Sequence, residues 1–416
     1  MLETTKYKLD NGLTILLTHY PESNISAVEV LVNFGPIDEN ETNMGAAHFI
    51  EHMLFKGTKT RKAADINRYI DDVGGTINAA TLKDTTVYYT ELPQKHMERG
   101  IDLLSDILLN STFPEEELER ERLVIQEEIK MIEDTPHKAI WNDIFSVAFK
   151  GSSVGMNIAG TKETVKKMKR EELARLYDKH YAPGDMVLSI VADLHKTSRE
   201  KILALAREKF ISGKKSCQAK REPISDKAMD IRISEEKREI AQAHQIIAIR
   251  FPPVNDPEWI IGRAIQKYLT GGMSSVLLSE IREKRGLAYA VYSDYNSSKT
   301  FGLYAVYAGM AEENREQVEK IILHEFSKLK ADKISQEDLA RLKGYMEGEF
   351  LTEIDNKLTL AGTLAQYEIY GSYKTAGEYL GAIQTITPEK MQGFSKKYLD
   401  TEHYFKALIM PEKSQG

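Results

Sequence analysis

The feature that most constrains this chain is a repeated order of strands and helices in its two halves. A β-branched strand at 26–34 ends at Gly35-Pro36, and a second strand at 243–251 ends at Pro252-Pro253. In each half, two helices, a pair of strands and two longer helices follow, with an offset of roughly 210–220 residues. We therefore predict an internal duplication of an α+β unit. The alternative is that unrelated α+β segments share this order by chance.

Between the halves lies a polar and basic stretch, Ser212–Lys227, without hydrophobic periodicity. Such a composition is more typical of a linker than of a binding patch. We predict two domains, 1–211 and 228–416, joined by a linker at 212–227. Each half of the 416 residues is long enough to form its own hydrophobic core.

Charge and cysteine content narrow the class of protein. The chain has 56 Lys and Arg against 63 Asp and Glu, a net charge of −7, which argues against a general binder of nucleic acid or anionic membranes. Its single cysteine, Cys217, excludes an internal disulfide framework and a multi-cysteine metal site. Because the N-terminus is polar and no apolar run reaches about 18 residues, we expect a cytoplasmic protein without a membrane span.

The strongest chemical motif is His48-Phe-Ile-Glu51-His52, in a segment that is otherwise almost wholly apolar. On a helix, positions 48 and 52 are about 40° apart, so both imidazoles share one face with Glu51 beside them. Polar groups in a buried helix need partners, and Zn²⁺ is the natural partner of two imidazoles at this spacing. The carboxylate is then free to act on water. The alternative is two core histidines that are hydrogen-bonded to the backbone.

A zinc site of this kind needs a third protein ligand. The segment 115–133 predicts a helix with Glu121 and Glu128 near the middle of its apolar stripe, whereas Glu127 falls on the outer face. Carboxylates in a buried stripe are costly unless they meet a cation or a metal. We therefore expect Glu128 or Glu121 to be the ligand, and the other to orient a ligand. The alternative is a structural ion pair with Arg or Lys.

The second half provides an internal comparison. An ungapped alignment of the two long helices places Leu342 opposite Glu121. It also places Glu349 opposite Glu128, but the helix expected near 258–270 contains no histidine. A lone carboxylate cannot form the usual zinc site. We expect the second half to keep the scaffold, to lack the metal and to handle substrate.

These motifs resemble those of the M16 (pitrilysin-type, inverzincin) zinc metallopeptidases, in particular short bacterial members similar to the β subunit of the mitochondrial processing peptidase. The resemblance covers nearly the whole chain, and its first motif is G-A-A-H-F-I-E-H-M-L-F-K-G-T. It implies the fold of processing-peptidase and LuxS-like metallohydrolases. In that fold, two homologous α+β domains each have a mostly antiparallel sheet packed against helices.

The resemblance also assigns roles at the site. It implies one Zn²⁺ per chain, with His48, His52 and Glu128 as the ligands. Glu51 would be the general base of peptide hydrolysis. Glu121 would be the other glutamate of the family's E-x(6)-E pair. It would be a catalytic residue that supports the metal ligands without binding the metal itself.

A match in the first half concerns substrate binding. The segment N-A-A-T, which begins with Asn78, Ala79 and Ala80, resembles the N-A-x-T edge strand of the family. There, a peptide adds to the sheet as an extra strand through backbone hydrogen bonds. Without the resemblance, this segment is a plain sheet element.

A match in the second half runs over R-E-K-R-G-L-A-Y, from Arg282 to Tyr289. Arg282 and Tyr289 resemble the pair that grips the substrate backbone in the family, although Arg282 by itself would be a solvated helix charge. Longer relatives place this pair and the zinc unit in opposite halves of a four-domain clamshell. A two-domain chain therefore implies a homodimer, in which Arg282 and Tyr289 complete the site of the partner.

The residues and the resemblance together predict a zinc endopeptidase that degrades or trims unfolded peptides inside a dimeric chamber. Its expected partners are peptide substrates and a second copy of the chain, and neither nucleic acid nor membranes. Two alternatives are a non-catalytic core or partner subunit of the same fold and a processing peptidase for one precursor. The first is disfavoured because the full set of expected metal and base residues is present.

Overall fold

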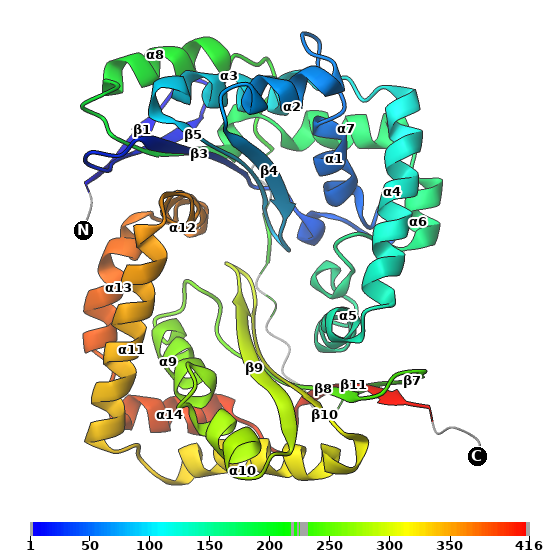
Figure 1. Cartoon of the computed structure of the whole chain (residues 1–416), viewed down its shortest axis with the longest axis vertical. Helices are drawn as coiled ribbons and strands as arrows, with labels where there is room; N and C mark the ends of the chain where they lie inside the picture. The colour runs from blue at the N-terminus through cyan, green and yellow to red at the C-terminus, as the bar shows by residue number, and fades with distance from the viewer. Residues whose placement is uncertain (1–2, 218–219, 223, 225–231, 413–416) are drawn as a thin grey trace. The chain divides into compact units, whose positions relative to one another are not determined.

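The computed structural model describes residues 3–217, 220–222, 224 and 232–412. The chain divides into two compact units, each with one sheet packed against helices (Figure 1), which confirms the predicted fold class. Unit 1 comprises Met1–Lys130, Met156–Lys220 and Thr352–Gly377, and unit 2 comprises Met131–Gly155, Arg221–Leu351 and Glu378–Gly416.

Unit 1 alternates short strands with helices, as the sequence predicts. Its elements, wholly or largely within the unit, are β1 (Thr4–Lys8), β2 (Thr14–His19), β3 (Ile25–Val32), α1 (Ala46–Leu54), α2 (Ala63–Asp71), β4 (Thr76–Thr81), β5 (Thr86–Pro93), α3 (Met97–Asn110), α4 (Glu115–Glu133), α6 (Lys162–Lys167), α7 (Arg170–His180), β6 (Met186–Ala192), α8 (Arg199–Lys209) and α12 (Lys357–Tyr370). The composition of residues 162–180 predicts one helix, which is wrong. The segment is divided into α6 and α7, because Met168, with ψ 126°, leaves the helical conformation.

The described strands of unit 1 form a sheet in the order β1-β2-β6-β3-β5-β4. Neighbouring strands are antiparallel except β2 and β6, so the sheet is mostly antiparallel as predicted. The turn that joins β1 to β2 contains Gly12 at φ 91°, a left-handed conformation that favours glycine. Among the described residues, strand β4 pairs with β5 alone, in a register that sets Asn78 opposite Tyr89, and is therefore one of the two edge strands of the sheet, with β1 at the other edge.

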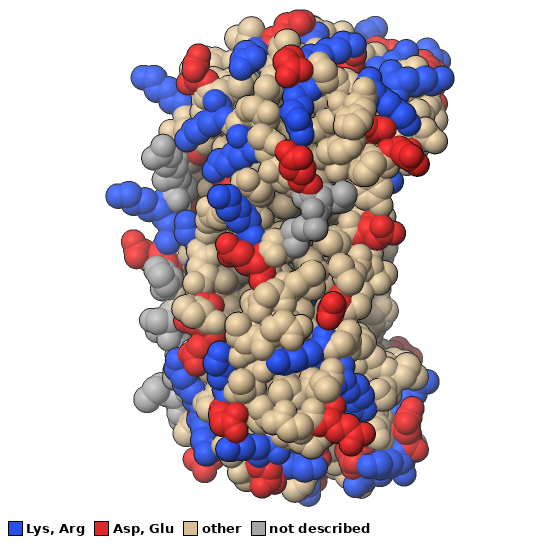
Figure 2. Space-filling model, turned by 90° about the vertical axis from the view of Figure 1, so that its left-hand side faces the viewer, with Lys and Arg blue, Asp and Glu red and all other residues tan. Residues whose placement is uncertain are grey.

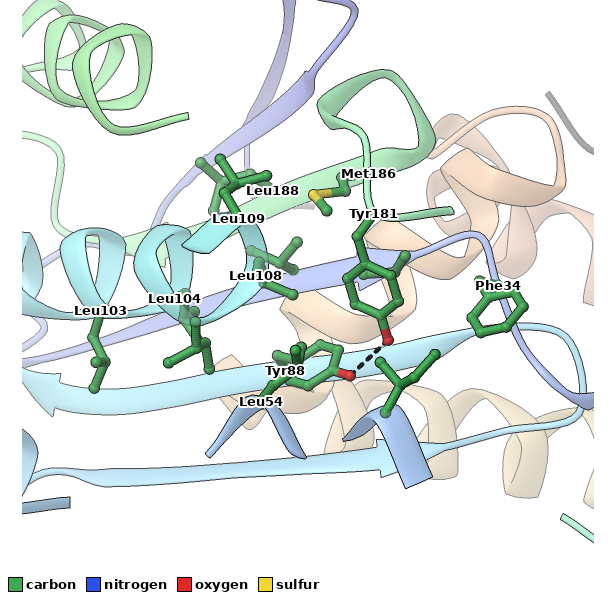
Figure 3. Packing of buried hydrophobic residues seen from close by; sticks show 14 of the residues in the cluster. Phe34, Leu54, Tyr88, Leu103, Leu104, Leu108, Leu109, Tyr181, Met186 and Leu188 are labelled. Carbon is green, nitrogen blue, oxygen red and sulfur yellow. Dashed lines mark hydrogen bonds between the residues drawn. The ribbon is translucent and has the colours of Figure 1, made fainter. Parts of the chain in front are cut away.

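The main core of unit 1 lies between this sheet and helices that include α1 and α3. Leu104 and Leu108 of α3 point toward the sheet, where Tyr88 of β5 and Leu188 of β6 are buried (Figure 3). The hydroxyl groups of Tyr88 and Tyr181 share a hydrogen bond of 2.8 Å inside this core. The buried hydroxyl groups of Tyr88 and Tyr181 are thus partners of each other, as burial of a polar group requires.

The opposite face of the sheet of unit 1 is covered by α12. Leu360 and Leu364 of α12 belong to one buried cluster with Leu31 of β3 and Val191 of β6. The sheet is therefore buried on both faces over its central strands. This position explains the nearly continuous apolar composition of β3 and β6, in which most residues are buried.

Unit 2 has the same kind of architecture. Its elements, wholly or largely within the unit, are α5 (Pro136–Ala148), β7 (Arg232–Arg238), β8 (Ala243–Arg250), α9 (Trp259–Thr270), a π-helical turn (Leu278–Glu283), β9 (Ala288–Ser297), β10 (Gly302–Met310), α10 (Arg315–Ala331), α11 (Gln336–Asp355), α13 (Lys374–Gln384), α14 (Pro388–Tyr398) and β11 (Phe405–Pro411). Its described strands follow the order β7-β11-β8-β10-β9, antiparallel except for β7 and β11.

Each unit includes a segment from the other half of the chain. Helix α12 packs on β3 and β6 of unit 1, and α5 packs on β8 and β11 of unit 2. The units thus differ from the predicted consecutive domains, 1–211 and 228–416, in these two segments. The pattern of apolar residues in one helix does not reveal which sheet the helix will cover.

The exchanged segments extend the internal repeat. They begin at Met131 and Thr352, which are 221 residues apart. Glu128 and Glu349, which the alignment of the long helices pairs, have the same separation. The two halves therefore correspond in the position of the exchanged helix as well as in the order of elements.

The junction between the long consecutive parts of the two units falls at Lys220 and Arg221, inside the predicted linker 212–227. Residues 218–219, 223 and 225–227 of that linker lie outside the described residues. The preceding part is held against unit 1, because Ser216 and the N–H of Cys217 both donate hydrogen bonds to Asp185.

The surface carries charges of both signs. On the face that Figure 2 shows, Lys and Arg side chains are interspersed with Asp and Glu. This mixture agrees with a net charge of −7 spread over 119 charged side chains of the two signs, 56 and 63. Among the helices in the described part of the chain, none combines the length and the apolar character that crossing a membrane requires.

Candidate metal centre

Helix α1 carries three of the predicted site residues, and its start is fixed by a carboxylate from outside the helix. Glu39 accepts hydrogen bonds from the N–H groups of Gly45 at 2.8 Å and Ala47 at 2.7 Å. Gly45 has φ 93°, and a Cβ there would lie 2.7 Å from the carbonyl oxygen of Ala159. Glycine is therefore required where the loop meets the helix. Burial, the largest effect, raises the pKa of Glu39 to about 7.

The histidines of α1 and Glu128 of α4 meet around one point. The rings of His48 and His52 have centroids 4.7 Å apart. Glu128 Oε2 lies 3.6 Å from Nε2 of His48 and 3.6 Å from Nε2 of His52. A tetrahedral zinc with bonds of about 2.0–2.1 Å keeps its ligand atoms about 3.3 Å apart. The three side chains therefore fit one small divalent ion.

Glu121 lies on the other side of the His52 ring. Nδ1–H of His52 donates to Oε2 of Glu121 at 2.9 Å, and Nζ of Lys56 lies 2.8 Å from Oε1. This contact fixes the tautomer of His52 and leaves its Nε2 to face Glu128. The sequence pattern left the order of the two glutamates open, and the geometry separates them into a ligand position and an orienting position.

Burial and neighbouring charges give the two histidines different protonation. Burial, and then the charge of His52, lowers the pKa of His48 to about 4, so this ring is neutral at pH 7. Burial also acts to lower the pKa of His52, but the hydrogen bond to Glu121 and the nearby carboxylate of Glu128 outweigh it and raise this pKa to about 9. In the metal-free protein, His52 is therefore protonated at pH 7, and a metal ion must displace that proton.

Glu51 is held by strand β4. Thr81 Oγ1 donates a hydrogen bond of 2.5 Å to Oε2 of Glu51. Burial raises the pKa of Glu51, and the hydrogen bond from Thr81 partly opposes this rise. A carboxylate with a raised pKa next to a metal position is suited to general-base chemistry.

The predicted substrate residues lie in two places. Asn78, Ala79 and Ala80 form the middle of β4, with Asn78 and Ala80 exposed and Ala79 partly buried. Arg282 lies exposed in the π-helical turn of unit 2, and Tyr289 lies in β9 with 52% of its surface exposed. The metal ligands and β4 therefore belong to unit 1, whereas the Arg/Tyr pair belongs to unit 2.

Two functional contacts were not singled out by the sequence analysis. Lys56 lies four residues after His52. On a helix, this spacing places two side chains on one face, where both could contact the same carboxylate. Thr81 lies thirty positions from Glu51, and no local pattern connects them. Both contacts depend on the packing of separate elements.

A second group of metal-binding residue types lies at the ends of β2 and β6. His19, Asp193 and His195 have ligand atoms within 4.8 Å of one another. However, the rings of His19 and His195 stack at 4.4 Å with an interplanar angle of 14°. Their in-plane lone pairs are nearly parallel and do not converge on one ion. Nδ1 of His19 also accepts a hydrogen bond of 3.1 Å from the N–H of Leu194.

Comparison with protein families gives matches in both halves of the chain. Residues 14–162 match the family described as Insulinase (Peptidase family M16). Residues 167–346 match the family described as Peptidase M16 inactive domain. The first match contains His48, Glu51, His52 and Glu128. The second contains α9, the helix of unit 2 that has no histidine.

Individual relatives cover nearly the whole chain. The chain is 30% identical over 407 residues to a Bacillus subtilis protein named "uncharacterized zinc protease YmxG", with 98% of each protein covered. It is 31% identical over 413 residues to the "uncharacterized zinc protease ML0855" of Mycobacterium leprae, with 98% of this chain and 92% of the relative covered.

Solved structures share the fold. A protease from Helicobacter pylori superposes with a TM-score of 0.91 at 20% identity, with 99% of this chain and 100% of that chain covered. A peptidase M16 inactive domain from Pseudomonas fluorescens has a TM-score of 0.90 at 19% identity, with 100% of both chains covered. Together with the family matches, these relatives confirm the resemblance that the motifs indicated. The chain belongs to peptidase family M16.

Proposed function

We propose that this protein is a zinc-dependent endopeptidase that hydrolyses peptides or unfolded polypeptides. The observation that carries the proposal is the convergence of His48, His52 and Glu128 on one point, with Glu51 on the same helix face. Relatives named zinc proteases support it. When bound there, one zinc ion would supply Lewis-acid activation of water and of the scissile carbonyl.

Glu51, Glu121 and Lys56 would have separate roles in the reaction. The carboxylate of Glu51 would accept the proton of the attacking water and return it to the leaving amine. Glu121, through Nδ1 of His52, would keep that ring aimed at the ligand position. Lys56 holds Glu121 in turn, so the three residues form one chain of charge-assisted contacts.

Strand β4 would hold the substrate. Its outer edge faces no other strand of the described chain, so its backbone groups can pair with an extended peptide. Backbone pairing at Asn78, Ala79 and Ala80 would depend little on the side chains of the peptide. We therefore expect broad specificity, limited by whether a polypeptide can be extended.

A second copy of the chain would complete the site. Arg282 is exposed and Tyr289 is half exposed, so both are accessible to a peptide held elsewhere. We propose a homodimer in which this pair from one copy contacts the peptide held by the partner and stabilises the charge that develops on its carbonyl oxygen. The peptide would then be enclosed in a chamber formed by two copies.

The test of the hydrolytic function is the Glu51→Gln variant. We expect it to keep its zinc, because Glu51 is not a ligand, and to lose peptide hydrolysis almost completely. The matched control is Glu127→Gln, since Glu127 is exposed on the outer face of α4. Elemental analysis and a fluorogenic peptide assay measure both properties. Equal turnover of Glu51→Gln and the wild type would remove Glu51 from the mechanism.

The test of the shared site mixes two inactive proteins. Glu51→Gln and Arg282→Ala should each be inactive alone, because each homodimer has two defective sites. After subunit exchange, a mixed dimer combines the intact Glu51 of one copy with the intact Arg282 of the other, so activity should reappear. If no mixture regains activity although mixed dimers form, each chain acts alone.

A further inference from the structure

We infer that Thr81 is a positioning residue that links the edge strand β4 to the carboxylate of Glu51. This inference rests on the proposed function and concerns how an extended peptide acts on the general base. Thr81 is the last residue of β4, and its hydroxyl donates a hydrogen bond of 2.5 Å to Oε2 of Glu51. The hydroxyl of one residue in the edge strand therefore contacts the expected base directly.

The alternation of exposure along β4 explains why Thr81 reaches Glu51. Exposed and partly buried residues alternate from Thr76 to Thr81, and Ile77, Ala79 and Thr81 are the partly buried set. Ile77 and Ala79 pack against the core of unit 1, and α1 packs against β4. Thr81 thus lies on the core side of the strand, next to the helix that carries Glu51.

The carboxylate of Glu51 needs an external contact to keep one orientation. It has rotatable bonds that α1 does not restrain, and it lies on the partly exposed face of that helix. A general base acts well only when its oxygen is held within hydrogen-bond reach of the proton it accepts. Loss of the Thr81 hydroxyl should therefore slow proton transfer more than it weakens peptide binding.

The place of Thr81 on the edge strand gives the contact a second consequence. Thr81 pairs with Thr86 of β5, and the turn between them is closed by a hydrogen bond from the N–H of Leu82 to the carbonyl of Thr85. The other edge of β4 is open among the described strands. A peptide paired with that edge would restrain β4 from both sides, and with it Thr81. Extended peptides should thus align Glu51 better than substrates too short to pair.

Three variants of the full-length, zinc-loaded protein test the inference. Thr81→Val removes the hydroxyl at nearly constant volume, Thr81→Ser keeps a hydroxyl, and Thr5→Val makes the same change in β1, at the opposite edge of the sheet. On a peptide of about ten residues, we expect Thr81→Val to lower kcat by about 10- to 100-fold, with KM within about three-fold. Thr81→Ser should retain most of the wild-type kcat, and Thr5→Val should match the wild type.

Substrate length is the second arm of the experiment. The ratio of kcat for a peptide of about ten residues to kcat for one of about three should be large in the wild type. In Thr81→Val this ratio should fall, because the long peptide can no longer act on Glu51 through the hydroxyl. A ratio unchanged by Thr81→Val would overturn the link between β4 and the base.

Two readouts separate positioning from a merely structural role. Zinc content and Tm of Thr81→Val should match those of Thr81→Ser, and loss of either in the Val variant alone would overturn the inference. The affinity of the long peptide for zinc-loaded Glu51→Gln, measured by fluorescence anisotropy, should change less than about three-fold when Thr81→Val is added.

The outcomes distinguish the inference from the function on which it rests. An active wild type with an equally active Thr81→Val would overturn the role of Thr81 and leave the proposed peptidase standing. A wild-type protein that holds zinc and cleaves no peptide would overturn both. A loss in kcat that Thr81→Ser restores, with zinc and affinity intact, supports both.

Discussion

The two units place a glutamate at corresponding positions of a long helix but give it different partners. In unit 1, Glu128 of α4 faces Nε2 of both His48 and His52. In unit 2, Glu349 of α11 pairs with Lys267 of α9, with Nζ and Oε1 2.5 Å apart. A partly buried carboxylate needs a positive partner. Unit 1 leaves room for a divalent ion, and unit 2 supplies an ammonium group from its own chain.

The two units also differ at the aligned positions Glu121 and Leu342. Glu121 in unit 1 holds His52 and Lys56, whereas the aligned Leu342 in unit 2 is a buried apolar residue. Once no histidine remains to be oriented, a carboxylate at this position would be an uncompensated charge. One scaffold therefore supports either a candidate metal centre or an ordinary core, depending on a few side chains where two helices cross.

The sharpest test of this comparison changes the paired glutamates. Glu128→Gln should lose most of its zinc and nearly all peptide hydrolysis, because a neutral amide is a poor ligand for zinc. Glu349→Gln should keep a full complement of zinc, since its carboxylate has an ammonium partner. Elemental analysis after dialysis measures both. Equal zinc loss in the two variants would contradict the assignment of the metal centre to unit 1.

The second-largest expected effect is a loss of zinc affinity when Glu121, the carboxylate that orients His52, is replaced. Glu121→Leu gives unit 1 the residue that unit 2 has at position 342. We expect zinc affinity to fall by about 10- to 100-fold, because Nδ1–H of His52 loses its acceptor. Competition with a chelator of known affinity measures the change, with Glu127→Leu on the outer face of α4 as the control. An unchanged affinity would mean that Glu121 does not support the site.

A smaller effect is expected in unit 2. Lys267→Met removes the ammonium group and leaves Glu349 without its cation, so the free energy of unfolding should fall by about 1–3 kcal/mol. The double variant Lys267→Met/Glu349→Leu should recover most of this loss, because no unpaired charge remains. Denaturant titration measures stability, and zinc content should stay constant. A double variant no more stable than the single one would argue against a paired charge.

The smallest effect concerns the helix that covers the sheet of unit 1. Glu29 of β3 is buried beneath α12, where a Cβ on Gly362 would lie 2.9 Å from its Oε1. Burial raises the pKa of Glu29 from 4.5 to about 8. Between these values the folded state keeps a proton that the unfolded state has lost, so this group makes the protein less stable as pH rises from about 4.5 to about 8.

Glu29→Gln removes this dependence. Compared with the wild type, the variant should gain about 1–2 kcal/mol near pH 7.5 and little near pH 4.5. The measurement is Tm as a function of pH, with Glu91→Gln on the partly exposed face of β5 as the control. If the stability difference between Glu29→Gln and the wild type is the same at both pH values, Glu29 does not hold its proton in the folded state.

Local patterns predicted the elements that carry the site better than the way they assemble. The apolar segment around His48–His52 predicts a helix near 43–56, and α1 runs over Ala46–Leu54. Helix α4 was expected and found at 115–133. Both have a strong apolar period, which backbone geometry converts directly into a helix. The break at Met168 has no glycine or proline in the surrounding sequence to signal it.

Residue spacing alone indicates the repeat, the shared face of His48, Glu51 and His52, and the two candidate glutamates. All of these follow from spacing along one chain segment, where 3.6 residues per turn sets the geometry. On a helix, Glu121 and Glu128 point in directions only about 20° apart, too close to rank them as ligands. Only the crossing of α1 and α4 placed Glu128 near both Nε2 atoms and Glu121 at Nδ1.

The tertiary structure also decided the contact of Thr81 with Glu51 and the exchange of α5 and α12 between units. These contacts join segments that are far apart in the chain, so no local period encodes them. They exist because a sheet edge and a helix face must bury their apolar sides together, and that packing sets which polar groups meet.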